Sequence, residues 1–142
     1  MIRPTLVTLA AAAVLAACVR YGGVAHVKAG STAADLVLQF AADDSGTPLP
    51  PVDAIMISGG PLNTSPRPGS QHGFTWYVAA LDTTPPASRV LREVRYGTVP
   101  SGFTEAAKPV RLMPGRYGAE IRAGHYRLKT SFVVDSDLTA HN

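Results

Sequence analysis

Apolar residues recur at every second position in four segments of the chain, at residues 35–40, 53–58, 74–81 and 90–96. This period is typical of a β-strand with one buried face. Residues rich in Gly, Pro and Asp separate the segments and predict turns between them. On the buried faces we expect Leu36, Leu38, Phe40, Ile55, Ile57, Phe74, Trp76, Val78, Ala80, Val90, Val94 and Tyr96.

Residues 115–134 predict a β-hairpin. With its turn at Ala123-Gly124, Glu120 lies opposite Arg127 as a cross-strand ion pair. One face is then apolar, with Tyr117, Ala119, Ile121, Tyr126, Leu128, Phe132 and Val134. The other face is charged, with Arg116, Glu120, Arg122, His125, Arg127 and Lys129. A shift of one residue in the pairing would mix apolar and charged side chains on both faces, so the sequence strongly favours this assignment of faces.

These segments predict an all-β fold over residues 34–142. No stretch beyond the N-terminal segment has a convincing helical period, and residues 110–112 add a short strand. We expect an antiparallel sandwich of immunoglobulin or transthyretin-like type with about six or seven strands. Residues 19–33 are small and weakly patterned, and we interpret them as a flexible tether that reaches at most roughly 50 Å.

The N-terminal segment has a different pattern. Arg3 precedes an uninterrupted run of 13 mostly apolar residues, 5–17, which ends at the chain's single cysteine, Cys18. The run is too short to span a bilayer as a helix but has the length of the apolar core of a secretory signal. We therefore expect a signal helix in residues 1–17. A chain with one cysteine forms no internal disulfide, and residues 18–142 are enough for one domain.

The string Leu15-Ala16-Ala17-Cys18 resembles the lipobox of bacterial lipoproteins. In that family the thiol is lipidated, the chain is cleaved just before the cysteine, and the new amino terminus is acylated. The resemblance implies that lipidated Cys18 attaches the protein to a membrane. Val19 follows the cysteine, where an Asp usually retains such proteins in the inner membrane. The resemblance thus implies a lipid-anchored protein of the outer membrane that faces the periplasm.

Charge is unevenly distributed along the chain. Residues 18–84 carry three basic and five acidic side chains, whereas residues 85–142 carry nine basic and five acidic ones. A basic half favours anionic surfaces such as lipid phosphates. The candidate contacts with an anionic envelope component or protein partner are Arg92, Arg95, Arg116, Arg122, Arg127 and Lys129. The long loop 59–73 adds Gln71 and His72, and no nucleic-acid-binding motif is present, so nucleic acid is not an expected partner.

Residues suited to catalysis or metal binding are scattered. The chain has no G-x-S-x-G string, and Cys18, its only thiol, is the expected lipidation site. His26, His72, His125 and His141 show no ligand spacing with one another or with acidic residues. We interpret Asp43-Asp44 as part of a turn, and Asp135 and Asp137 as part of a frayed C-terminus. We therefore expect a non-enzymatic protein without cofactor or metal.

Two further resemblances bear on function. Residues 76–134 resemble small uncharacterised β-sandwich lipoproteins through the strings Tyr96-Gly97, Pro100-Ser101-Gly102-Phe103 and Leu112-Met113-Pro114-Gly115-Arg116-Tyr117. That resemblance implies a fold and no activity. Residues 44–55 resemble a segment of the small lipoproteins that anchor type VI secretion machines. We expect a lipid-anchored binding or assembly module of the envelope; the alternatives are a structural component of such a secretion machine and a periplasmic metal carrier.

Overall fold

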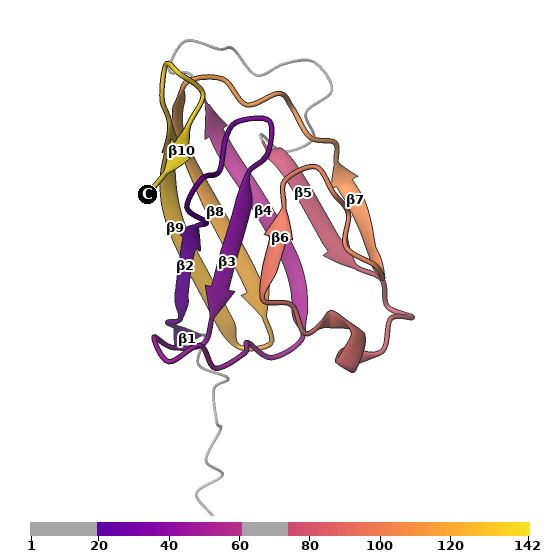
Figure 1. Cartoon of the computed structure of the whole chain (residues 1–142). Coiled ribbons are helices and arrows are strands. Elements are labelled where there is room, and N and C mark those ends of the chain that lie inside the picture. Colours follow the sequence, from indigo (N-terminus) through magenta and orange to yellow (C-terminus); the bar gives the residue numbers. More distant parts are fainter. Residues whose placement is uncertain (1–19, 61–73) are drawn as a thin grey trace, which may run out of the picture.

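A computed structural model describes residues 20–60 and 74–142. The predicted signal helix, Cys18, Gln71 and His72 lie outside these residues. Within them, two β-sheets pack face to face (Figure 1), which confirms the predicted β-sandwich. The strands are β1 (Arg20–Tyr21), β2 (Val24–Val27), β3 (Val37–Ala41), β4 (Val52–Gly60), β5 (Phe74–Ala80), β6 (Glu93–Arg95), β7 (Phe103–Ala107), β8 (Gly115–Ala123), β9 (Tyr126–Val134) and β10 (Ala140–His141).

The larger sheet has seven strands in the order β1-β9-β8-β4-β5-β7, with β10 also paired to β9. The smaller sheet has the order β2-β3-β6. All neighbours are antiparallel except β1 and β9, which are parallel. A short 3₁₀ helix, Pro86–Arg89, lies between β5 and β6.

The core lies between the sheets and is filled by the side chains that alternate inward. Ile55, Ile57, Trp76 and Ile121 are fully buried there, and Leu38 reaches the same cluster from the smaller sheet. Burying such side chains contributes roughly 1.5–3 kcal/mol each, which is the main force that holds the two sheets together. Trp76 also donates a 3.1 Å hydrogen bond from Nε1 to Glu105 Oε2, so its polar atom is satisfied at the margin of the core.

The final hairpin has the predicted faces but a different register. Its turn is Gly124-His125, so Glu120 lies opposite Lys129 and Arg122 lies opposite Arg127. The predicted pair of Glu120 with Arg127 is therefore wrong. The true register differs from the predicted one by two positions, which leaves every strand residue on its expected face. Gly124 has φ of 58°, in the left-handed region that favours glycine at a tight turn.

The predicted tether at residues 19–33 is also wrong for most of its length. Val24–Val27 forms a strand paired with β3, and Val27 is buried in the core. Gly23 has φ of 101°, and a Cβ at this position would lie 2.8 Å from the Leu128 side chain. The folded domain therefore begins more than ten residues before residue 34. The segment has a weak strand pattern of its own, but its pairing with β3 stabilises it as a strand.

Two segments of the middle region differ from the prediction. Residues 90–92 are not a strand, Val90 is 46% exposed, and only Glu93–Arg95 pairs with β3. Residues 110–112 are not a strand either, although Leu112 is buried. Phe103–Ala107 forms the edge strand β7, although no alternating pattern predicts a strand there. Likewise the C-terminal residues are not frayed, since Ala140–His141 pairs with β9.

The turn before β8 holds the side chain of Tyr117, which the sequence predicts to be in the core. Tyr117 is 3% exposed, and its ring stacks on Phe132 at 5.3 Å between centroids. Its hydroxyl donates to the Met113 carbonyl at 2.8 Å and accepts from the Met113 amide at 2.9 Å. A tyrosine that hydrogen-bonds back to the backbone a few residues upstream is the tyrosine corner of β-sandwiches. The expectation that Tyr117 lies on the apolar, buried face of the hairpin is thus confirmed.

Candidate functional site

The outer face of the larger sheet, the face turned away from the smaller sheet, carries the candidate site. Strand register places its side chains in three transverse rows. The first row contains Phe74, Ser58, Gly118 and Ser131. The second contains Tyr77, Met56, Glu120 and Lys129, and the third contains Ala79, Ala54, Arg122 and Arg127. Strands β5, β4, β8 and β9 supply one residue each to every row.

The first row forms the floor of a groove because its central residues are small. The groove has a volume of about 620 Å³ and is lined by Met56, Ser58, Phe74, Gly118, Ala119, Glu120, Lys129, Thr130 and Ser131. A Cβ on Gly118 would lie no closer than 3.8 Å to any neighbour, so its missing side chain leaves open space. Met56 is only 5% exposed and gives the groove an apolar base.

An aromatic wall closes the β5 side of the groove. A register shift between Ile57 and Ser58 pairs Phe74 with Ser58. The expectation that Phe74 shares the buried face of Trp76 is therefore wrong, because this bulge moves it to the outer face. Its ring meets the Tyr77 ring edge-on at 5.2 Å between centroids. The groove thus combines an apolar, aromatic end with a charged end at β8 and β9.

The charged end has more cations than anions. Arg122 donates from Nε to Glu120 Oε1 at 2.8 Å, and Lys129 Nζ lies 4.0 Å from the other carboxylate oxygen. No ion pair between described residues involves Arg116 or Arg127. One carboxylate among four basic side chains leaves this face positive, which favours an anionic partner.

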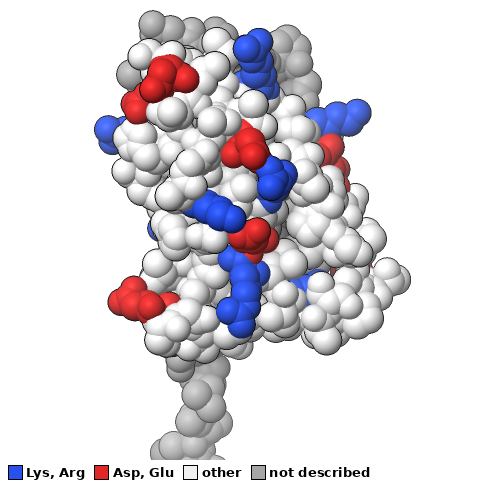
Figure 2. All heavy atoms as spheres, viewed as in Figure 1, with Lys and Arg blue, Asp and Glu red and all other residues white. Residues whose placement is uncertain are grey.

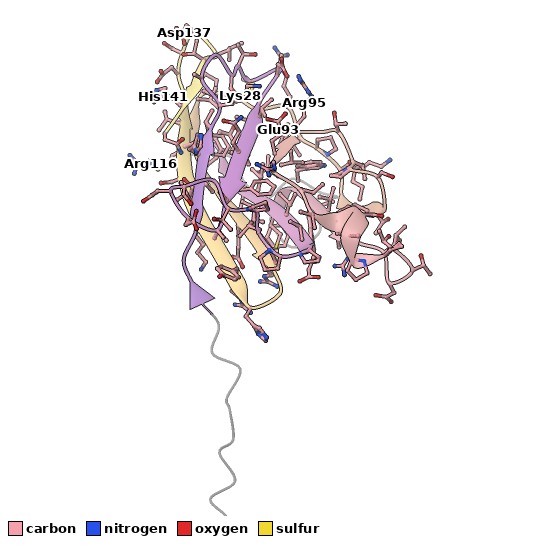
Figure 3. The ribbon with its side chains drawn as sticks, turned by 60° about the horizontal axis from the view of Figure 1, so that its bottom comes forward. Lys28, Glu93, Arg95, Arg116, Asp137 and His141 are labelled. Carbon is pink, nitrogen blue, oxygen red and sulfur yellow. The ribbon has the colours of Figure 1, made fainter. Side chains whose placement is uncertain are left out.

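The structure separates the six predicted basic contacts into two groups. Arg116, Arg122, Arg127 and Lys129 share the outer face of the larger sheet. Arg95 lies on β6 of the smaller sheet, and Arg92 comes just before that strand, beside the groove next to β3. Figure 3 shows Arg95 near Lys28 and Glu93 on the smaller sheet, with Arg116 apart from them. The six candidate contacts therefore do not share one surface, because the segments that carry them belong to different sheets.

The outer surface of the smaller sheet is charge-balanced. Arg95 pairs with Asp35, and Glu93 accepts a hydrogen bond from Gln39 at 3.2 Å and lies 4.0 Å from Lys28. Figure 2 shows blue and red side chains next to one another on this side of the molecule. A shallow groove of about 320 Å³ here is lined in part by Asp43, Asp44 and Arg92. Such balanced, exposed pairs contribute little net field.

The acidic side chains of the turns are held by local hydrogen bonds. The hydroxyls and backbone amides of the same turn donate to Asp43 and hold its pKa at about 2. Hydrogen bonds from Thr139 lower the pKa of Asp137. Within residues 20–60 and 74–142, no group of three or more His, Cys, Asp or Glu side chains is arranged to hold a metal ion.

Sequence reasoning missed the groove because its residues come from distant segments. Ser58, Gly118 and Ser131 carry no motif, and only the register of β4, β8 and β9 aligns them. Within the described part of the chain, no helix is long and apolar enough to cross a membrane. Comparisons with protein-family models, curated proteins and solved structures found no match to this chain.

Proposed function

We propose that this protein is a lipid-anchored binding or assembly module of the bacterial envelope. In this proposal, lipidated Cys18 holds it at the periplasmic side of the outer membrane, and a partner docks on the outer face of the larger sheet. The protein performs no chemistry, and its role is to hold a partner near the membrane. The lipobox resemblance at residues 15–18 supports the anchor.

The main support for the proposed docking site is the groove and its charged end. It places the apolar base at Met56 and the rings of Phe74 and Tyr77 beside a positive array on β8 and β9. Binding sites usually combine a concave apolar surface with a few polar groups that fix orientation. An extended partner segment with an apolar side chain followed by an acidic one matches this order of chemistry. Its positive end, where Lys129 lines the groove, speeds encounter with such a segment at low salt.

The test is to fill the groove without disturbing the core. Gly118→Trp places a large ring over Ser58 and Ser131, where the backbone has ordinary strand geometry and no neighbour blocks a Cβ. Gln39→Trp adds the same ring to the outer surface of the smaller sheet and is the matched control. Both variants are expressed as full chains in the native envelope, crosslinked and purified with their partners.

We expect Gly118→Trp to lose the partner that the wild-type protein and Gln39→Trp retain. Equal recovery with all three proteins would refute the groove as the docking site. Subunits of a secretion machine among the crosslinked partners would favour the alternative of a structural component of that machine.

A further inference from the structure

Two arginines face each other across the last hairpin. Arg122 on β8 and Arg127 on β9 are direct register partners. Like charges in this arrangement destabilise a sheet. Glu120 compensates Arg122 through the 2.8 Å contact, but no ion pair between described residues involves Arg127. The pair therefore keeps a positive charge that a bound anion would neutralise.

The same pair lies where the N-terminal segment joins the domain. β1 runs beside the start of β9, with Tyr21 as the register partner of Arg127 (Figure 1). Tyr21 is three residues after Cys18. Three residues span at most about 11 Å, far less than the roughly 50 Å of a free tether of residues 19–33. An anchor at Cys18 thus holds Arg127 close to the bilayer surface.

Other charges at this end decide which side meets the bilayer. Asp53 is already neutralised by Arg89 at 2.7 Å and accepts a hydrogen bond from the Gly124 amide. Asp43 and Asp44 lie in the loop that follows β3, on the side of the smaller sheet. Asp43 and Asp44 repel anionic lipid, whereas the arginine pair attracts it. The charges therefore tilt the hairpin, rather than the β3–β4 loop, toward the membrane.

We propose that Arg122 and Arg127 bind the phosphate of an anionic phospholipid in the membrane that holds Cys18. This inference rests on the lipid anchor of the proposed function and adds an orientation to it. Guanidinium groups bind phosphate oxygens through paired hydrogen bonds. Gly118 is four residues from Arg122 along β8, so the groove stands about 13 Å farther along the strand from the bilayer. The anchor and the arginine contact together present the groove to partners in the periplasm.

The experiment uses the full, lipidated protein in vesicles that contain a nitroxide-headgroup lipid. Because lipidation consumes Cys18, an introduced cysteine is labelled selectively with a fluorophore. His125→Cys places the label at the exposed hairpin turn, and Met113→Cys places it before β8 at the opposite end. Vesicles of phosphatidylcholine are compared with vesicles that also contain phosphatidylglycerol.

We expect nitroxide quenching of the label at position 125, only in phosphatidylglycerol vesicles, and no quenching at position 113. Arg122→Gln with Arg127→Gln should reduce the ratio of membrane-contacting to non-contacting protein about 25-fold, from about fivefold for each arginine. Arg116→Gln, on the same strand but far from the turn, should leave the quenching unchanged. High salt should remove the difference between the two vesicles.

Three results overturn the inference, and they are distinguishable. Protein that does not float with the vesicles refutes the lipid anchor and the orientation with it. Protein that floats but shows equal quenching with and without the two arginines refutes the phosphate contact alone. Strong quenching at position 113 refutes the orientation. The thermal midpoint of the double variant serves as the folding control and should change little, since removal of the like-charge pair offsets the loss of the exposed Arg122–Glu120 ion pair.

Discussion

The tyrosine corner gives the most direct test of the fold. Tyr117→Phe removes one oxygen atom and leaves the ring stacked on Phe132. The change deletes two hydrogen bonds, one donated by the hydroxyl to the Met113 carbonyl at 2.8 Å and one accepted from the Met113 amide at 2.9 Å. No cavity forms in the core, because the hydroxyl lies at the turn and Met113 is 40% exposed.

The expected loss follows from the two bonds. Each hydrogen bond contributes about 0.5–1.5 kcal/mol net, so the free energy of unfolding should fall by about 2 kcal/mol. For a domain of this size that corresponds to a fall in the thermal midpoint of about 8 °C. Urea denaturation followed by Trp76 fluorescence measures the free energy directly, because this tryptophan is fully buried in the native state.

Tyr126→Phe is the matched control for this prediction. Tyr126 lies on β9 and is partly buried against the same core, but no hydrogen bond between described residues involves its hydroxyl. Its loss should change the free energy of unfolding by less than about 0.5 kcal/mol. If Tyr117→Phe is no more destabilising than Tyr126→Phe, the corner does not hold the turn and the reasoning is refuted.

Three further predictions concern the anchor, the core and pH. Cys18→Ser should move the protein from the membrane to the soluble fraction, and a variant that still incorporates labelled palmitate and sediments with membranes would contradict the lipobox assignment. Trp76→Ala should lower the free energy of unfolding by about 3–5 kcal/mol, measured by denaturation followed by circular dichroism, and an unchanged midpoint would contradict its burial. Hydrogen bonding to Asn142 and contact with Asp135 raise the pKa of His141 above 6.5. The stability that His141 contributes is therefore fully present below pH 6.5 and is lost as the pH rises through its higher pKa in the folded protein. If the free energy of unfolding depends on pH in the same way for the wild type and for His141→Gln, this linkage is refuted.

The hairpin shows how far periodicity alone can determine structure. Alternation along 115–134 sorted apolar from charged residues correctly, yet the turn lies one residue later than predicted, at Gly124-His125. Registers that differ by two place the same strand residues on the same faces, so the pattern cannot separate them. The choice depends on distant groups, including Asp53, which accepts a hydrogen bond from the Gly124 amide at 2.9 Å.

Weakly patterned strands form for a similar reason. Val24–Val27 and Phe103–Ala107 show little alternation, but each pairs with a strand whose own pattern is clear, β3 and β5. The side chain of Asn142 adds a 2.5 Å hydrogen bond from the Val27 amide. Strand formation at such segments reflects the neighbours available in the fold more than the intrinsic preference of the residues.

The sequence by itself determined the all-β class, most of the inward positions on the main strands, the core positions of Trp76 and Tyr117, and the basic character of the last hairpin. These properties follow from period-2 alternation and from local turn chemistry, which depend on neighbouring residues only. Tertiary structure alone decided which cations share a surface and how Ser58, Gly118 and Ser131 align into a groove. Sheet order and register set those properties, and both arise from packing between segments far apart in the chain, where a local pattern carries no information.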